Sequence, residues 1–330
     1  MAQTTDEISM EKGYSYIEGN EYFRGLLQIL KPDISGLMNE PYLPKIERLN
    51  IHEEAHEAKI DFSAFTGLKE LTIQGFKEYV LPKEICGLRH LESLSVVKCT
   101  LPPEIGSMAQ LHDLRIDVSD PSRIPESIVE LQGLTSLDIS SHEPDILSFP
   151  RWVSKLHGLE SLDLSLCRFS DIDIDITRLP KLKRLSFIGA LSYLNINGFP
   201  PLGNLKNLEK LRIDGDGYYP FETKSYPKAD YDLFPSIIES IKDLQSLKTL
   251  ELNGWRSRKK SDYLLQGGKK TIPDIFDHFP KLEILGLSGM RIELLPPSIY
   301  KLKHLRVIYL HDNAIDASAL KFGSEVEVCM

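Results

Sequence analysis

A short pattern of aliphatic residues recurs along most of the chain. It reads L-x-x-L-x-L, with Ile, Val or Phe accepted for Leu, and its last apolar positions alternate with polar ones, as in LESLDL at 159–164. Such alternation predicts a short β-strand with aliphatic side chains on one face and polar side chains on the other. The pattern starts eleven times, at Ile46, Leu68, Leu91, Leu111, Leu134, Leu159, Leu182, Leu208, Leu247, Leu282 and Leu305.

A second signature follows the strands, and its spacing is helical. In LPKEICGL at 81–88, Pro82 suits a first helical position, Glu84 lies near the positive end of the helix dipole, and Ile85 and Leu88 share a face. We therefore expect a short helix or helical turn after each strand. Related segments are LPPEIGSM at 101–108, IPESIVEL at 124–131, FPRWVSKL at 149–156, IPDIFDHF at 272–279 and LPPSIYKL at 295–302.

The strand starts are separated by 20 to 26 residues, apart from two intervals of 39 and 35 residues. This period is typical of leucine-rich repeats, whose aliphatic side chains only stacked neighbours can bury. From 46 to 315 the chain resembles that family, particularly its intracellular LPxxIxxL type, as in Ras-binding repeat scaffolds and plant or bacterial leucine-rich repeat proteins. The resemblance implies an α/β solenoid of about eleven repeats, with a curved parallel sheet on a protein-binding concave face and short helices on the convex face.

One departure from the family concerns the buried asparagine expected at the ninth position of each repeat. Among the eleven repeats only Asn313 stands there, while Cys99 and Cys167 are accepted substitutes in two others. Backbone hydrogen bonds in the loops must therefore be satisfied differently from repeat to repeat.

The two ends lie outside the pattern. Residues 1–45 are expected to form an N-terminal cap that is mostly helical, because EYFRGLLQIL at 21–30 suits an amphipathic helix before Pro32. Residues 316–330 are expected to form a C-terminal cap or tail, since a solenoid exposes an apolar edge at each end.

Two long insertions follow neighbouring strands. The first, at 214–233, carries a net charge of −3, and the second, at 255–271, carries +5. Opposite charges on adjacent loops can simply pair, but long loops with exposed aromatic and basic residues are also frequent binding sites. The candidate anchors are Tyr218, Tyr219, Phe221 and Tyr226 in the first loop and Trp255, Arg256, Arg258, Lys259 and Lys260 in the second.

Polar strand residues between the core leucines should point into the concave face. In repeats four to six they include five acidic residues and one arginine, which favours a basic partner segment. Towards the C-terminus the face is expected to become basic and then apolar, although polar residues also simply keep a sheet face solvated. The candidate contact residues are Asp113, Arg115, Asp117, Asp138, Glu160, Asp163, Arg184, Arg212 and Tyr309.

Composition narrows the functional classes. The 330 residues are 42% hydrophobic and 26% charged, as in ordinary globular proteins, and the net charge of −9 opposes binding to nucleic acid or anionic membranes. No signal peptide is visible, and the four cysteines show no zinc or disulfide spacing. We therefore expect a cytoplasmic protein, with delivery into a host cell by a non-classical signal as the alternative.

Catalytic motifs find little support. His52, Glu53 and His56 spell H-E-x-x-H, but zinc peptidases need both histidines on one helix, and here they follow a strand. DIDID at 171–175 lacks the glycine and the final glutamate of a calcium loop, and no P-loop or nucleophile motif is present.

The sequence thus predicts a non-enzymatic module that binds another protein through its concave face and its two long loops. It predicts no cofactor and no resident metal, and a monomer is the default. Two alternatives stay open: the sensor or targeting part of an immune or pathogen-effector system, and, more remotely, a zinc-dependent hydrolase.

Overall fold

The chain folds into two compact units, residues 1–139 and 140–330, and the repeats continue through both of them. The computed structural model describes residues 14–17, 26–30, 36–52, 60–119, 121–141, 147–167, 169–189, 199–215, 233–255, 264–266 and 268–330. All eleven predicted strands are present, and each begins two residues after the first apolar residue of its L-x-x-L-x-L pattern. The leucine-rich repeat architecture predicted from the sequence is confirmed.

In the first unit the strands lie in chain order, and every described pair after the first is parallel. A register shift between Gln74 and Tyr79 interrupts the longest strand. The strands are β1 (Tyr14–Ile17), β2 (Leu26–Ile29), β3 (Arg48–Ile51), β4 (Glu70–Val80), β5 (Ser93–Thr100), β6 (Asp113–Asp117) and β7 (Ser136–Ser140).

The second unit repeats this arrangement in the order β8-β9-β10-β11-β14-β15-β16, while β12 and β13 form a separate antiparallel hairpin. The strands are β8 (Ser161–Asp163), β9 (Arg184–Ile188), β10 (Lys210–Asp214), β11 (Thr249–Glu251), β12 (Leu264–Gln266), β13 (Lys269–Thr271), β14 (Ile284–Gly286), β15 (Val307–Tyr309) and β16 (Glu327–Cys329).

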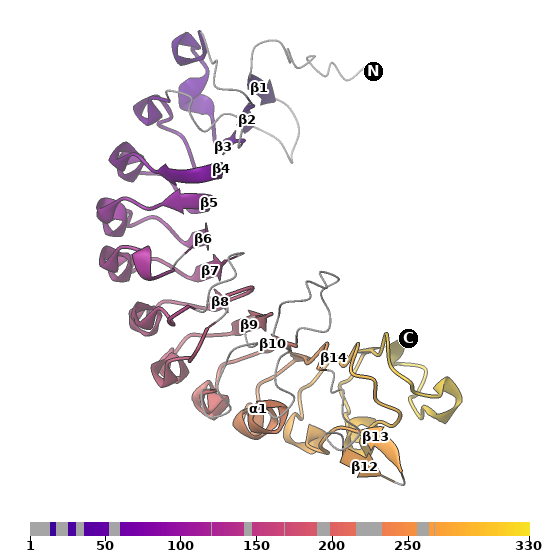
Figure 1. Cartoon of the computed structure of the whole chain (residues 1–330). Coiled ribbons are helices and arrows are strands. Elements are labelled where there is room, and N and C mark those ends of the chain that lie inside the picture. Colours follow the sequence, from indigo (N-terminus) through magenta and orange to yellow (C-terminus); the bar gives the residue numbers. More distant parts are fainter. Residues whose placement is uncertain are drawn as a thin grey trace, which may run out of the picture. The chain divides into compact units, whose positions relative to one another are not determined.

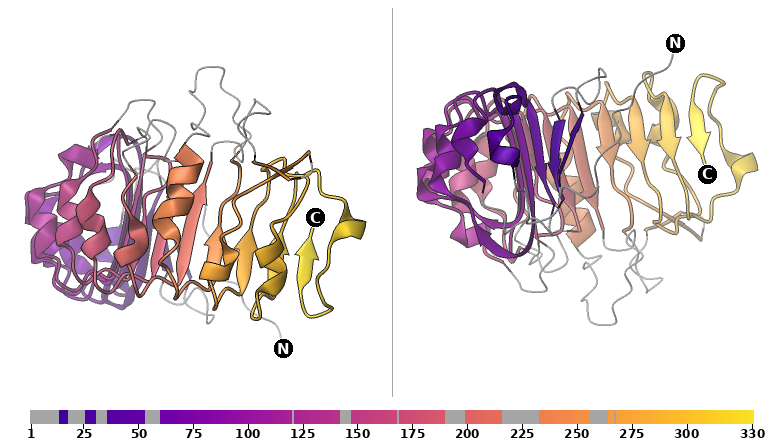
Figure 2. Two further views of the ribbon diagram at one scale, coloured as in Figure 1. Left: turned by 90° about the horizontal axis from the view of Figure 1, so that it is seen from below. Right: turned by 90° about the horizontal axis from the view of Figure 1, so that it is seen from above.

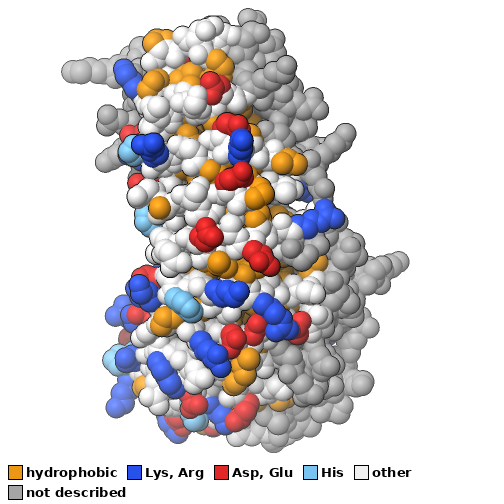
Figure 3. All heavy atoms as spheres, turned by 90° about the vertical axis from the view of Figure 1, so that its left-hand side faces the viewer, with side chains coloured by type: hydrophobic (Ala, Val, Ile, Leu, Met, Phe, Trp, Pro, Cys, Tyr) orange, Lys and Arg blue, Asp and Glu red, His pale blue; other side chains and the backbone are white. Residues whose placement is uncertain are grey.

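Short 3₁₀ segments return the chain from one strand to the next, and in each unit they lie on the side opposite the strands (Figures 1 and 2). Figure 3 faces this side. The residue before several of these segments is a proline in extended conformation, such as Pro82, which turns the chain before the helical turn begins. The segments are Leu37–Asn39, Leu43–Lys45, Phe62–Ala64, Lys83–Gly87, Pro103–Ser107, Pro121–Arg123, Glu126–Glu130, Arg151–Lys155, Ile174–Arg178, Leu202–Asn204, Phe276–His278, Pro297–Lys301 and Ala317–Ala319.

The core of each unit consists of apolar columns that run from rung to rung. In the first unit the parallel register places Leu49 beside Leu71, Leu71 beside Leu94, and Leu94 beside Leu114, and each of these side chains is at most 1% exposed. Burial of one such side chain is worth about 1.5–3 kcal/mol. Because that burial depends on the rungs above and below, the repeats stabilise one another.

The predicted N-terminal helix is wrong over residues 26–29, which form strand β2. Leu27 and Ile29 pair with Leu49 and Ile51 and are fully buried, so they belong to an additional rung. A short apolar run does not distinguish a strand from a helix. This rung also departs from the L-x-x-L-x-L pattern, because Arg24 occupies its first apolar position. Residues 21–25 lie outside the described residues.

The described parts of the insertions hold one helix and one hairpin. Helix α1 (Leu233–Ile241) follows the first insertion and buries Phe234, Ile237, Ile238 and Ile241. It replaces the 3₁₀ segment of its repeat, and hairpin β12–β13 ends the second insertion. After the last predicted repeat, β16 pairs with β15 and adds a rung to the sheet of the second unit.

The loops satisfy their backbone hydrogen bonds by different residues, as the missing asparagines predict. Asn313 donates to the carbonyl groups of Leu287 and Leu310, at 2.7 and 2.9 Å, and accepts from the Ile292 amide. At the same position in another repeat, the Cys99 thiol donates to the Val97 carbonyl oxygen within strand β5. The repeats therefore share their strands and differ in their loops.

Candidate protein-binding surfaces

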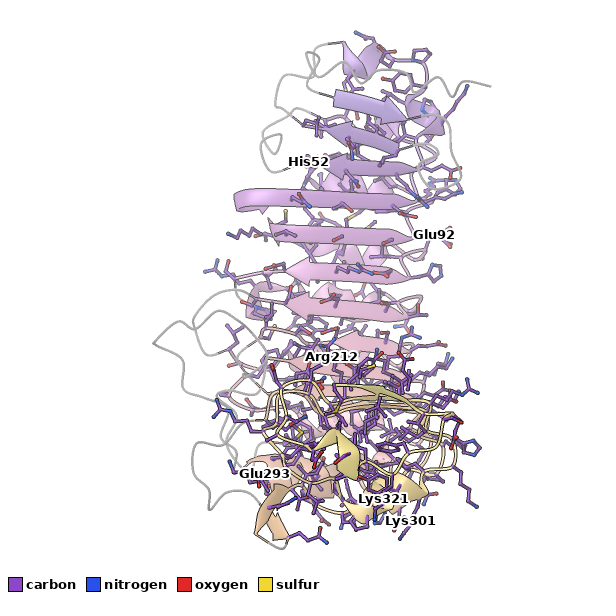
Figure 4. The ribbon with its side chains drawn as sticks, turned by 90° about the vertical axis from the view of Figure 1, so that its right-hand side faces the viewer. His52, Glu92, Arg212, Glu293, Lys301 and Lys321 are labelled. Atoms are coloured by element: carbon purple, nitrogen blue, oxygen red, sulfur yellow. The ribbon has the colours of Figure 1, made fainter. Side chains whose placement is uncertain are left out.

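Strand residues that alternate with the core leucines point away from the core and form the exposed face of the sheet, opposite the 3₁₀ segments. Figure 4 looks onto this face in the first unit. The burial pattern of β6 alternates between buried and more exposed residues, with Asp113, Arg115 and Asp117 on the exposed face. This alternation follows directly from the period of two in a β-strand.

In the first unit the exposed face carries an excess of negative charge. At the positions that alternate with the core aliphatic residues, from β3 to β7, the described charged residues are two bases, Arg48 and Arg115, and four acids, Glu70, Asp113, Asp117 and Asp138. Lys98, exposed near the end of β5, adds a third base, so the net charge of these strands is −1. Arg48 lies 3.2 Å from Glu70. Arg115 lies 3.6 Å from Asp113, so the base in the predicted acidic cluster is next to an acid.

The acidic cluster predicted from the sequence is divided between the two units. Asp113, Asp117 and Asp138 lie on neighbouring strands of the first unit. Glu160 and Asp163 belong to the second unit.

In the second unit both acids have partners: that of Glu160 lies on the next rung, and that of Asp163 lies on its own rung. The Lys183 ammonium group lies 2.9 Å from Glu160 and lowers the pKa of that carboxyl group, and Ser165 donates a hydrogen bond to Asp163. Arg184 donates to the hydroxyl group of Ser161 at 3.3 Å.

The predicted basic stretch of the exposed face is compensated by acids on the same and neighbouring strands. Arg212, labelled in Figure 4, lies 2.7 Å from Asp214 and 3.4 Å from Glu251, and Lys210 lies 3.3 Å from Glu251. Across β8 to β11, the three bases Arg184, Lys210 and Arg212 are therefore matched in number by three acids: Asp163, Asp214 and Glu251. The expectation of a net basic surface here is wrong, because consecutive parallel strands bring opposite charges together.

A buried polar network lies where both insertions leave the sheet. Asp214 is fully buried; one of its carboxylate oxygens accepts hydrogen bonds from the backbone and side-chain amides of Asn253. Asn253 in turn accepts a bond from the Ser288 amide at 2.9 Å. Burial raises the pKa of Asp214, and the neighbouring Arg212 guanidinium group opposes this shift. The network links three consecutive rungs. In the sequence it is indicated by the polar residues Asp214, Asn253 and Ser288, which all occupy the seventh position of their repeats.

Trp255 does not serve as an exposed loop anchor, and that expectation is wrong. Its side chain is 1% exposed, packs against Phe234 and donates from Nε1 to the Ile213 carbonyl oxygen at 2.9 Å. It stands at the ninth position of its repeat, so the indole replaces the family asparagine. The other predicted loop anchors lie outside the described residues, namely Tyr218, Tyr219, Phe221, Tyr226, Arg256, Arg258, Lys259 and Lys260.

The last rungs of the second unit expose apolar side chains, as predicted. Tyr309 is 39% exposed and stacks on His311, with 6.4 Å between the ring centroids. Ile284 and Val307 are half-buried beside it on paired strands.

The motifs with possible chemistry are only partly described. His52 follows β3, and its backbone amide donates to the Ile29 carbonyl oxygen, while residues 53–59 lie outside the described residues. In the DIDID segment, Asp173 caps a 3₁₀ segment and pairs with Arg151, as does Asp171, so these acids have structural partners. In the parts of the chain that are described, no group of three or more metal-ligating side chains occurs.

Comparison with known proteins supports a leucine-rich repeat assignment. No family model matches the chain. Over 163 residues, 45% of the chain, it is 36% identical to the TMV resistance protein N of Nicotiana glutinosa. The chain covers only 14% of the length of that protein.

Solved structures with a similar fold are leucine-rich repeat or receptor proteins. A leucine-rich repeat protein of Leptospira interrogans aligns over 92% of the chain and 89% of its own, with 20% identity and a TM-score of 0.50. TLR13, solved in complex with ssRNA13, aligns over 94% of the chain and 40% of its own, with 20% identity and a TM-score of 0.58. None of the helices within the described ranges has the length and apolar character that a membrane span requires. The repeat pattern, the stacked parallel strands and these likenesses show that the chain has the leucine-rich repeat fold.

Proposed function

We propose that the chain is a non-enzymatic module that binds a basic segment of another protein on the exposed sheet face of its first unit. The observation that carries this proposal is the group of three acids on that face, Asp113, Asp117 and Asp138, on the neighbouring strands β6 and β7, with Arg115 as the one base among them. Side chains held on paired strands lose little conformational entropy when a partner docks. An acidic surface also attracts basic segments and disfavours acidic ones.

A sensor or targeting role in an immune system is the second candidate. The specific observation in its favour is the 36% identity to part of a plant resistance protein. In this role the repeats would recognise a ligand, and an activity on a further segment or a partner chain would respond to it.

The proposal is tested by charge reversal on the exposed face. The double variant Asp117→Lys and Asp138→Lys should weaken binding of a fluorescent lysine-rich peptide about tenfold at low ionic strength, because each exposed pair contributes about 0.2–1 kcal/mol. Fluorescence anisotropy gives the affinity, and binding to the original chain should weaken as salt is added.

The matched control reverses acids on the opposite side of the same unit. Glu104 and Glu126 lie in 3₁₀ segments, so Glu104→Lys with Glu126→Lys changes the net charge equally. This control should retain most of the affinity. Equal losses in both double variants would show that net charge alone attracts the peptide, and the proposed surface would be wrong.

A further inference from the structure

An open groove in the second unit lies at the edge where strands β9, β10, β11 and β14 begin. Its charged lining consists of four lysines and two glutamates: Lys181, Lys183, Lys248, Lys281, Glu160 and Glu209. These residues lie in the turns that lead into the strands, away from the centre of the exposed sheet face. The groove is thus a second surface, separate from that of the proposed function. Its net charge is positive, whereas the exposed face of the first unit is acidic.

The residues directly before the strands form an inner column of the groove, in which positive and negative charges cancel. Glu160, Lys183, Glu209 and Lys248 each directly precede a strand, on four consecutive rungs. Lys183 lies 2.9 Å from Glu160, and Lys248 lies 2.9 Å from Glu209. Each lysine lowers the pKa of the carboxyl group that it contacts, so both glutamates stay ionised at neutral pH.

The residues three positions before the strands form an outer column, and it carries two positive charges that no acid in the column balances. In the strand register, Lys181, Asn207, Ser246 and Lys281 occupy the same position on four consecutive rungs. Asn207 donates to the Pro180 carbonyl oxygen at 2.8 Å and fixes the turn between two rungs. Neither Lys181 nor Lys281 forms an ion pair within the described part of the chain. Three strand spacings separate them, which is about 14 Å.

We infer that this groove binds an acidic segment of a partner protein in extended conformation, with two acidic side chains four residues apart on Lys181 and Lys281. An extended peptide rises about 3.3 Å per residue, so side chains four residues apart lie on one face and about 13 Å apart. That separation matches the two lysines. Asn207 and Ser246 supply polar groups between them.

The alternation of charge in the inner column disfavours a uniform polyanion. A nucleic acid strand would place phosphates along the whole groove and bring some of them against Glu160 and Glu209. A peptide carries acids only at the required positions and can place neutral residues opposite the glutamates.

The test uses the full chain and fluorescent synthetic peptides. One peptide carries two aspartates four residues apart in a neutral background, and a second carries them two residues apart. The chain should bind the first peptide several-fold more tightly, and the double variant Lys181→Glu and Lys281→Glu should weaken that binding about tenfold.

The control is Lys155→Glu with Lys321→Glu, which reverses two exposed lysines outside the groove and gives the same net charge. It should retain the affinity of the original chain. No measurable binding, equal losses in both variants, indifference to the aspartate spacing, or tighter binding of a single-stranded oligonucleotide would each overturn the inference. Binding of the lysine-rich peptide should be unchanged in Lys181→Glu and Lys281→Glu, so this test stands apart from that of the proposed function.

Discussion

Two buried side chains fix the backbone at the points where the two long insertions leave the sheet. Asp214 ends β10 and is the first residue of the first insertion, and Trp255 directly precedes the undescribed part of the second. Both contact a neighbouring rung: Asp214 through Asn253, and Trp255 through the Ile213 carbonyl group. Residues that leave the repeat pattern are therefore fixed by polar contacts as well as by apolar packing.

Replacement of Trp255 should be costly. Trp255→Ala removes a fully buried side chain and is expected to lower the free energy of unfolding by about 3–5 kcal/mol. Trp255→Phe keeps most of the volume but leaves the Ile213 carbonyl oxygen without its donor, at a cost of about 1–3 kcal/mol. Urea unfolding followed by circular dichroism measures both. A loss well below 1 kcal/mol for the alanine variant would contradict the packing described here.

The buried carboxyl group of Asp214 predicts a pH dependence of stability. Because burial raises its pKa, the folded state binds this proton more tightly than the unfolded state. Its stabilising contribution is complete below the ordinary pKa, about 4, and is lost as the pH rises through the raised value. The stability of the original chain relative to Asp214→Asn should therefore fall as the pH rises from about 4. Urea titrations over a pH series measure this difference. An increase with pH would show that the Arg212 ion pair outweighs burial.

At the scale of the element, close packing between 3₁₀ segments predicts opposite effects for two glycines. A Cβ atom on Gly106 would collide with the Ser127 carbonyl oxygen in the next repeat, whereas one on Gly87 would meet nothing within 4 Å. Gly106→Ala should therefore lower the free energy of unfolding by about 1–3 kcal/mol. Gly87→Ala should be neutral or stabilising by up to about 1 kcal/mol, because it restricts the unfolded chain. Thermal unfolding compares the two, and equal effects would contradict the packing of the first unit.

The regular elements were predictable because their burial pattern is encoded locally. Each L-x-x-L-x-L copy places its own core residues, so every one of the eleven strands begins where the pattern indicates. Strand β2 was missed because Arg24 breaks the first apolar position, and the sequence LLQI fits a helix equally well. Periodicity within one segment carries no information about the strand that will pair with it.

The binding surfaces were less predictable, because charge compensation depends on neighbouring rungs. Arg212 suggests a basic surface in its own strand, but Glu251, 39 positions later in the chain, neutralises it from the next strand. Trp255 has the composition of an interface anchor and is instead part of the core. The groove at the strand starts becomes visible only when the register aligns Lys181 with Lys281.

At the scale of the whole molecule, the repeats build surfaces of different charge from one type of rung. The first unit has an acidic exposed face, and the second has a compensated face, apolar last rungs and a lysine-lined edge. The residues of the acidic face lie on paired strands, and those of the lysine-lined edge lie in the turns that precede the strands.

The most direct test of the central claim is to locate the bound basic segment on the first unit. Zero-length carbodiimide cross-linking joins a lysine of the bound lysine-rich peptide to a carboxylate that it contacts, and mass spectrometry identifies that carboxylate. We expect cross-links at Asp117 and Asp138 on the exposed sheet face, and loss of these links at high salt. Cross-links that fall mainly on Glu104, Glu126 and Glu130, in the 3₁₀ segments on the other side, would contradict it.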